Sequence, residues 1–178
     1  MQSDIIFGCE TNLNIDMKAE QYDIPGYYNK NFAGKLDQIG RGLIVYSKKE
    51  EDVHNIETIM RNDVEYGKIT ISLEAKTLII LFLYRSEKYP LRQFKDDLDD
   101  LVKENENETN VIILGDMNTE ELLIKGDYVQ LVNEPTTREG TRIDQAYVKL
   151  EGLHAKGYVL YKCFEESYHH PICVNITI

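Results

Sequence analysis

Long hydrophobic runs are missing from this chain of 178 residues. Its longest apolar stretches, residues 77–84 and 111–114, are far shorter than the roughly 20 residues that a membrane-spanning helix needs. No charged segment followed by an apolar one opens the sequence, and no internal repeat or low-complexity linker divides it. We therefore expect one domain over residues 1–178, without a membrane span or a removable leader.

Cysteine is scarce. The three residues Cys9, Cys163 and Cys173 are an odd number, and their spacing matches no common metal-binding pattern. We interpret them as buried, reduced thiols. Reduced thiols favour a reducing compartment, so we expect an intracellular protein, nuclear or cytoplasmic.

Positive charge is also in short supply. The chain has 20 Lys and Arg against 31 Asp and Glu, which gives a formal net charge of −11 and a sequence pI near 4.8. Such a charge opposes long-range attraction to a phosphate backbone. A bound divalent cation can reverse the potential locally, so the charge argues against a nucleic-acid partner without excluding one.

Short apolar or alternating runs indicate strands along most of the chain. The expected strands cover residues 4–9, 42–46, 68–73, 78–84, 111–114, 143–148, 157–161 and 172–178. After Pro90, apolar residues recur at helical spacing from Leu91 to Val102 and aspartates occupy the other face, which predicts one amphipathic helix with a solvated acidic surface. Many strands with few helices predict an α+β fold in which two packed sheets are flanked by helices.

The most informative segment is residues 111–118, where an apolar strand ends in Gly115, Asp116, Met117 and Asn118. A strand that ends in this way presents Asp116 and Asn118 together at the rim of a sheet. By itself the pattern also fits an ordinary junction between a strand and a turn, since Gly, Asp and Asn all favour turns. Neighbouring motifs are needed to decide between the two readings.

Three further polar residues stand at strand ends. Glu10 follows the first expected strand, and a glutamate there is a suitable oxygen ligand for Mg²⁺. Asp144 opens a later strand, and His169 precedes the last one. A carboxylate that pairs with a histidine fixes the imidazole tautomer and raises its basicity.

In this order the motifs resemble those of the endonuclease/exonuclease/phosphatase superfamily, the DNase I-like proteins. That family shows a strand ending in Glu, then Gly-Asp-x-Asn, then Ile-Asp, then Ser-Asp-His. Residues 24–27, 40–46 and 83–85 are also similar to family segments, so the resemblance spans nearly the whole chain. It implies a four-layered αβ sandwich and hydrolysis of a phosphodiester with Mg²⁺ or Mn²⁺ as cofactor.

The resemblance also implies a role for each motif residue. Glu10 would ligate the metal. Asp116 would orient or deprotonate the attacking water, and Asn118 would position that water or contact the phosphoryl oxygens. Asp144 would orient His169.

His169 and Tyr84 would contact the scissile phosphate as negative charge builds up on it. For a nucleic-acid substrate, basic residues should surround the mouth of the site. Arg41, Arg85 and Arg142 are the candidates for substrate binding, together with Arg138, because they lie close to the motifs in the sequence.

The sequence departs from the family pattern at Tyr168, where the family has an aspartate next to the histidine. A phenol is neutral near pH 7 and is a poor ligand for a hard cation. We therefore expect weakened metal binding. Short forms with Ser-Tyr-His at this motif resemble domains of mobile-element or virus-derived proteins.

A second departure is at the start of the chain. Family members have another strand and helix before the glutamate strand, including an asparagine that helps to shape the site, whereas Glu10 lies only nine residues after Met1. We expect either a natural loss or a chain cut from a larger polypeptide. A missing strand leaves an open sheet edge, through which the chain can associate with itself.

Three functions remain in competition. The first is a metal-dependent endonuclease with nucleic acid as its substrate. The second is an impaired pseudonuclease that acts as a binding module, which Tyr168 and the acidic composition favour. The third is a phosphatase-like enzyme for a small phosphorylated substrate, which the net charge of −11 fits better.

Overall fold

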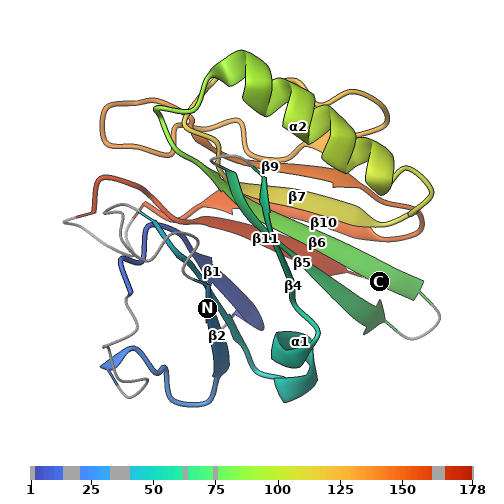
Figure 1. Cartoon of the computed structure of the whole chain (residues 1–178). Coiled ribbons are helices and arrows are strands. Elements are labelled where there is room, and N and C mark those ends of the chain that lie inside the picture. The colour runs from blue at the N-terminus through green and yellow to red at the C-terminus, as the bar shows by residue number, and fades with distance from the viewer. Residues whose placement is uncertain are drawn as a thin grey trace.

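A six-stranded sheet lies at the centre of the protein (Figure 1). The computed structural model describes residues 3–13, 21–32, 41–61, 64–73, 76–161 and 167–177. The strands of the sheet, in spatial order, are β4 (Glu57–Arg61), β5 (Val64–Leu73), β6 (Lys76–Arg85), β7 (Val111–Asp116), β9 (Asp144–Lys149) and β8 (Val129–Gln130). Strands β6 and β7 are parallel and all other neighbours are antiparallel, so the sheet is mixed.

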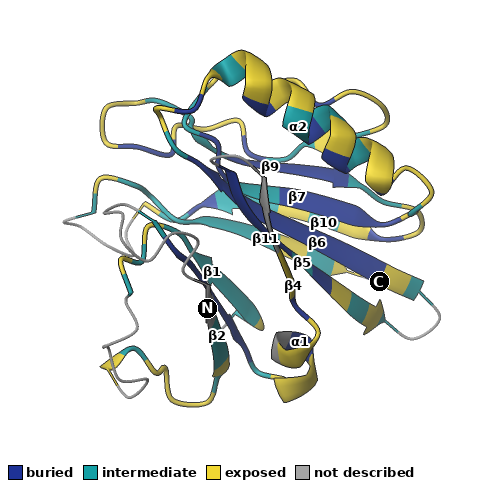
Figure 2. Ribbon diagram, viewed as in Figure 1, coloured by how far each residue is buried: buried dark blue, intermediate teal, exposed yellow. Residues whose placement is uncertain are grey.

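Helix α2 (Leu91–Glu104) connects the two parallel strands and covers one face of the sheet (Figure 1). It begins directly after Pro90, as the sequence predicted. Its buried residues Phe94, Leu98 and Leu101 belong to the same apolar cluster as the core residues of β6 and β7. The opposite face of the helix is largely exposed (Figure 2).

A second layer of strands packs against the other face of the central sheet. It consists of two antiparallel sheets, β1 (Ile5–Gly8) with β3 (Leu43–Ser47) and β2 (Tyr28–Phe32), and β10 (His154–Val159) with β11 (Ile172–Thr177). Phe7 of β1 stacks on Phe82 of β6 with ring centroids 4.5 Å apart. Val174 and Ile176 of β11 pack against an apolar cluster that includes Ile80. The site lies at the end of the interface between the two layers.

The α+β sandwich predicted from the sequence is confirmed, with two differences in detail. Only the central sheet is mixed, because both sheets of the second layer are antiparallel. Helix α1 (Glu50–His54) is one short turn beside β2, β3 and β5. Within the described ranges, therefore, α2 is the only helix long enough to cover a sheet face, and the outer face of the second layer lacks the expected helical cover.

Sequence patterns missed β2, α1, β4 and β8. Strand β2 has the sequence YNKNF, in which polar residues obscure the alternation, and β8 has only two residues. Such short edge elements are determined by pairing with neighbours more than by their own composition. Strand β5 also extends further toward the N-terminus than expected, beginning at Val64.

The open edge expected in the sheet is present. Within the part of the chain that the structure describes, β1 and β11 each end a sheet without pairing with one another. Self-association through this edge, membership of a larger polypeptide and the loss of an N-terminal strand stay predictions. No helix among the described residues has both the length and the apolar character that crossing a membrane requires.

Cys9 is a free thiol, and both Cys9 and Cys173 are partly buried. Cys163 lies outside the described residues, and so does Ile178, the last residue of the final predicted strand.

Candidate active site

Four polar side chains form one row across the central sheet. Glu65 pairs with Tyr84, Tyr84 with Asp116, and Asp116 with Asp144, on four adjacent strands. Residues in register on neighbouring strands project from the same face and lie about 4.8 Å apart from strand to strand. Because Tyr84 packs in the cluster with residues of the second layer, the row faces that layer.

The second layer supplies two residues that meet this row. Glu10 follows β1 with a left-handed φ of 51°, and its Oε1 accepts a hydrogen bond of 2.5 Å from the Tyr84 hydroxyl. His169 precedes β11, and its Nδ1 lies 2.9 Å from Oδ2 of Asp144. Segments far apart in the sequence thus contribute one polar cluster, although its surroundings are mostly apolar.

Asp116 is held from both sides by backbone geometry. Gly115 before it has a φ of 148°, and a Cβ atom there would lie 1.8 Å from the carbonyl oxygen of Leu83, so only glycine fits. Asn118 after it has a left-handed φ of 47° and donates its backbone N–H to Oδ1 of Asp116 at 2.9 Å. The Asn118 side-chain amide donates to the carbonyl oxygen of Arg85 at 2.7 Å. Asn118 therefore fixes the position of the Asp116 carboxylate.

Burial and neighbouring charge shift the titration of the cluster. Burial raises the pKa of Asp116 to about 7, and the negative charges of Asp144 and Glu10 act in the same direction. The hydrogen bond that His169 donates to Asp144 raises the pKa of His169 above its ordinary value. Near neutral pH, Asp116 can therefore accept a proton, and His169 keeps its proton to a higher pH than an ordinary histidine does.

Neither Cys9 nor Tyr84 is an activated nucleophile. Burial, followed by the charges of Asp116 and Asp144, strongly raises the pKa of the Cys9 thiol. Burial and the hydrogen bond to Glu10 do the same for the Tyr84 phenol. Both groups keep their protons at physiological pH, so covalent catalysis by either one is disfavoured.

Thr136 joins the Asp144 strand to the His169 segment, and nothing in its sequence context had indicated it. The residue is fully buried, and its Oγ1 accepts hydrogen bonds from the backbone N–H groups of Ile143 at 3.2 Å and Asp144 at 3.1 Å. Its carbonyl oxygen accepts a hydrogen bond from the N–H of His170 at 2.7 Å.

The sequence analysis also missed Glu65, although a lone carboxylate between Val64 and Tyr66 is a visible signal.

Arg85 corrects a sequence-based prediction. It was expected at the mouth of the site, but it is only 5% exposed, and its guanidinium donates to the carbonyl oxygens of Met117, Asn118 and Tyr89. Its donors are engaged with backbone oxygens because the loop after β7 has carbonyl groups that need partners away from water. Arg85 therefore supports the loop that follows Asp116, and it is not placed to contact a substrate.

The other arginines lie at the periphery. The guanidinium of Arg41 lies over the Tyr84 ring, 5.9 Å from its centroid, which places it beside the cluster. The backbone N–H of Arg142 donates to Glu120 at 2.8 Å, and that of Arg138 donates to the carbonyl oxygen of Tyr168 at 3.1 Å. Of the predicted substrate contacts, Arg41 has the position that fits best.

Tyr168 points to the surface. Its side chain is exposed, and its hydroxyl donates to Oε2 of Glu139 at 3.2 Å. Its ring meets His169 edge to face, with centroids 5.1 Å apart. A family aspartate would add a carboxylate here, whereas Tyr168 adds a hydrophobic flank to the imidazole.

The structure thus brings Glu10, Tyr84, Asp116, Asp144 and His169 together, with Asn118 beside Asp116. Potential ligand atoms of Asp116, Asp144 and His169 lie within 4.8 Å of one another. The catalytic and binding roles assigned to these residues stay predictions.

Solved structures of other proteins share this architecture. No protein-family model matches the chain, and no curated protein matches it by sequence. Solved structures do match. The catalytic domain of human Nocturnin with a bound sulfate anion is 13% identical, with a TM-score of 0.65 over 98% of this chain and 81% of that one.

Two further structures show the same similarity. D. rerio TDP2 complexed with a single-strand DNA product is 12% identical, with a TM-score of 0.66 over 98% of this chain and 86% of that one. The endonuclease domain of TRAS1, a telomere-specific non-LTR retrotransposon, is 14% identical, with a TM-score of 0.59 over 86% of this chain and 79% of that one. The chain therefore has the fold of the endonuclease/exonuclease/phosphatase proteins, as its ordered motifs predicted.

Proposed function

We propose that the chain is a divalent-metal-dependent phosphodiesterase that cleaves nucleic acid as an endonuclease. The observation that carries this proposal is that three separate motifs meet in one polar cluster at the ends of the strands. In this cluster, potential ligand atoms of Asp116, Asp144 and His169 lie within 4.8 Å of one another. A phosphate-cleaving site needs a general base, a group that stabilises negative charge, and a place for a cation. The cluster contains candidates for all three.

The donor set fits Mg²⁺ or Mn²⁺. Carboxylate oxygens are the ligands that these hard cations prefer. Burial is the main cause of the raised pKa of Asp116, and the negative charges of Asp144 and Glu10 add to it, so a cation would relieve the repulsion between these carboxylates. Glu10 is the candidate ligand, because Nδ1 of His169 is engaged with Asp144 and Asp116 is the candidate base. When bound, the cation supplies Lewis-acid polarisation of a phosphoryl oxygen.

Asp116 is suited to act as the general base. Its pKa of about 7 lets it exist as a carboxylate near neutral pH while remaining basic enough to accept a proton from water. Oδ1 accepts the backbone N–H of Asn118 at 2.9 Å, whereas Oδ2 accepts only a longer hydrogen bond of 3.4 Å from the Asn118 side-chain amide, so Oδ2 is the better placed of the two to receive this proton. Asn118 keeps the carboxylate in a fixed orientation during the transfer.

His169 is suited to stabilise the phosphate. Asp144 holds the Nδ1 side of the ring, so the second donor of the protonated ring, the Nε2 N–H group, faces away from that carboxylate. A cationic imidazole can donate to a phosphoryl oxygen as charge builds up on it. The Tyr84 hydroxyl donates a hydrogen bond to Glu10 and so orients the glutamate, and a direct phosphate contact by Tyr84 stays a prediction.

Several finer assignments belong to the same proposal. Nucleic acid as substrate is supported by the similarity to TDP2 bound to a single-strand DNA product. An origin in a mobile element is supported by the similarity to the TRAS1 endonuclease domain. Location in a reducing intracellular compartment, nuclear or cytoplasmic, is supported by the free thiol of Cys9.

A plasmid-nicking assay tests the hydrolase. Supercoiled DNA incubated with the chain should convert to the open-circle form in Mn²⁺ or Mg²⁺, and not in chelator. Asp116→Ala should abolish the reaction, and Asp100→Ala, a change on the exposed face of α2, should leave it intact. Equal inactivity of the wild type and Asp116→Ala in every metal would refute the proposal.

A non-catalytic binding module is the second candidate, and the surface position of Tyr168 favours it. With this side chain turned to Glu139, the cluster has one carboxylate fewer than the family pattern provides. Calorimetry separates the two functions. Mn²⁺ binding that disappears in Glu10→Ala supports the enzyme, whereas nucleic-acid binding without any metal binding supports the module. A small phosphorylated substrate is the third alternative, and turnover of p-nitrophenyl phosphate without plasmid nicking would favour it.

A further inference from the structure

Glu65 is a carboxylate of the core that the proposed reaction does not use. It lies on β5 next to Tyr84 of β6, and it is only 3% exposed. An ionisable side chain is rarely buried to this extent unless hydrogen bonds hold it. Its Oε2 accepts a hydrogen bond of 3.1 Å from the backbone N–H of Gly42. Gly42 is buried as well, so this N–H group needs a partner inside the protein.

This hydrogen bond crosses from one strand layer to the other. Glu65 belongs to the central sheet, whereas Gly42 directly precedes β3 of the second layer. The neighbouring Tyr84 makes a second crossing of the same kind, because its hydroxyl bonds to Glu10 after β1. Strands β1 and β3 are antiparallel neighbours, so the end of β1 and the beginning of β3 lie side by side. Two adjacent side chains of the central sheet therefore hold two adjacent strand ends of the second layer.

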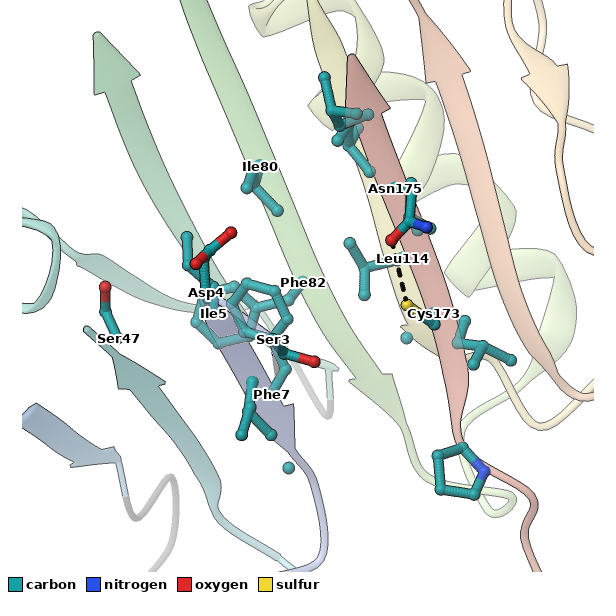
Figure 3. A pocket seen from close by; sticks show the side chains of 18 of the residues that line it. Ser3, Asp4, Ile5, Phe7, Ser47, Ile80, Phe82, Leu114, Cys173 and Asn175 are labelled. Carbon is teal, nitrogen blue, oxygen red and sulfur yellow. Dashed lines mark hydrogen bonds between the residues drawn. The ribbon is translucent and has the colours of Figure 1, made fainter. Parts of the chain in front are cut away.

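Apolar packing fixes β1 itself but not the residues that follow it. Phe7 of β1 stacks on Phe82 of β6, with ring centroids 4.5 Å apart (Figure 3). Strand β1 ends at Gly8, and beyond it Glu10 and Asn12 are both exposed and both have a left-handed φ of 51°. This backbone conformation is unfavourable for a glutamate, so further contacts have to hold the segment in place.

One peptide group links Glu65 to this segment. The N–H of Gly42, which bonds to Glu65, and the carbonyl group of Arg41 belong to the same planar peptide unit and point in opposite directions. The carbonyl oxygen of Arg41 accepts the backbone N–H of Asn12 at 3.0 Å. A hydrogen bond that fixes this peptide plane therefore also fixes residues 10–12, which include the candidate metal ligand.

A second hydrogen bond and the Arg41 side chain strengthen this link. The N–H of Thr11 donates to the carbonyl oxygen of Gly42 at 3.3 Å. The guanidinium carbon of Arg41 lies 5.9 Å from the centroid of the Tyr84 ring. Tyr84 in turn bonds to Glu10, so the connection returns to the strand next to β5. Arg41 and Glu10 are therefore held in place by the same set of contacts.

We propose that Glu65 is a positioning residue: through the peptide group of Gly42 it holds Glu10 in place to bind the metal ion. Glu65 acts on the cation only through these contacts. Residues that orient a metal ligand in this way commonly change metal affinity by about ten-fold to a hundred-fold when they are replaced. The role of Glu10 as the ligand rests on the proposed function, whereas the hydrogen-bonded connection exists in the metal-free protein.

Three variants of the full chain separate the hydrogen bond from packing. Glu65→Met keeps a side chain of similar length and removes the acceptor for the N–H of Gly42. Glu65→Gln keeps an oxygen that can accept this hydrogen bond. Asp52→Leu is the matched control. Asp52 is also a buried carboxylate, but it accepts a hydrogen bond of 2.7 Å from Ser47, at the other end of β3 (Figure 3).

Amide hydrogen exchange, measured by NMR in the presence of chelator, reports the connection without any metal. Exchange at Thr11, Asn12 and Gly42 should be about ten-fold faster or more in Glu65→Met than in the wild type, because local opening then costs less. Glu65→Gln and Asp52→Leu should leave these three amides close to the wild type. Equal exchange at Thr11 and Asn12 in the wild type and Glu65→Met would overturn the proposal.

Calorimetry with Mn²⁺ alone measures the consequence at the ligand. The affinity should fall by about ten-fold or more in Glu65→Met, and Glu65→Gln and Asp52→Leu should bind Mn²⁺ as the wild type does. Faster exchange with unchanged Mn²⁺ affinity would overturn the positioning role, and so would an equal loss of affinity in Glu65→Gln or in Asp52→Leu. If the wild type binds no Mn²⁺, the proposed function fails, and the exchange rates alone decide whether Glu65 holds residues 10–12.

Discussion

The hydroxyl of Tyr84 donates a hydrogen bond of 2.5 Å to Oε1 of Glu10, across 74 positions of sequence and between the two strand layers. Glu10 follows β1 in the second layer, and Tyr84 lies on β6 of the central sheet. The bond therefore positions the candidate metal ligand with respect to the row of side chains that contains Asp116.

Tyr84→Phe tests this relationship. The change removes the donor and leaves the ring, so we expect a loss of about 1 kcal/mol in the free energy of unfolding. Because Glu10 then loses its orientation, Mn²⁺ affinity measured by calorimetry should fall by roughly ten-fold. Tyr89→Phe is the matched control, since its hydroxyl bonds to Asp97 on the helix face of the sheet. A similar fall in metal affinity in both variants would contradict the prediction.

Asp116 should make the metal-free protein less stable as the pH rises. Its pKa is raised to about 7 in the folded state from an ordinary value of 3.8, so between these values the folded protein binds a proton that the unfolded chain has lost. The free energy of unfolding therefore decreases through this window. Asp116→Asn should increase it by the order of 2 kcal/mol at pH 8 and have little effect at pH 4.

Urea unfolding in the presence of chelator measures this effect at both pH values. Asp100→Asn serves as the control, because Asp100 is exposed on α2 and its ionised form stays hydrated. If Asp116→Asn were no more stable than the wild type at pH 8, burial of an ionised Asp116 would not be the cause of the lower stability at that pH.

Asp144 should control the protonation of His169. The hydrogen bond to Asp144 is the main cause of the raised pKa of His169, so Asp144→Asn should lower this pKa toward the ordinary value. Proton NMR titration of the imidazole reports the change directly. In the wild type the bond stabilises the fold below the ordinary pKa of histidine, and this contribution disappears as the pH rises through the raised value. Asp100→Asn should leave the His169 titration as it is.

Gly115→Ala separates steric contact from backbone conformation. The added Cβ would lie 1.8 Å from the carbonyl oxygen of Leu83, so we expect a loss of at least about 3 kcal/mol in the free energy of unfolding. Gly126→Ala is the control. Gly126 also has a positive φ, of 90°, but no atom lies within 4 Å of its ideal Cβ position, so only the conformational penalty of about 1 kcal/mol applies. Equal losses on urea unfolding would show that contact with Leu83 is unimportant.

Arg85→Lys tests the correction to the sequence-based role of this residue. Lysine keeps the charge but cannot reach the backbone oxygens of Met117, Asn118 and Tyr89 together. We expect a loss of about 2 kcal/mol in stability and a lower rate of plasmid nicking at saturating DNA. A change in DNA affinity alone, with stability unchanged, would restore Arg85 as a substrate contact.

Much of the site was visible in the sequence because its residues follow recognisable strand ends. The run before Gly115 identified β7, and the order of Glu10, Asp116, Asp144 and His169 identified the fold. Such strands are determined locally by apolar patterning. The short edge strands β2 and β8 escaped notice, because their pairing rather than their composition makes them strands.

The sequence by itself determined which polar residues stand at the strand ends, the helix after Pro90 and the α+β class, since each follows from patterns within a few neighbouring residues. Only the tertiary structure decided that Arg85 supports the loop after Asp116, that Thr136 joins Asp144 to the His169 segment, and that β1 and β11 belong to separate sheets. These facts depend on the register between distant strands. Register is set by packing of the whole sheet, and no local stretch of sequence contains it.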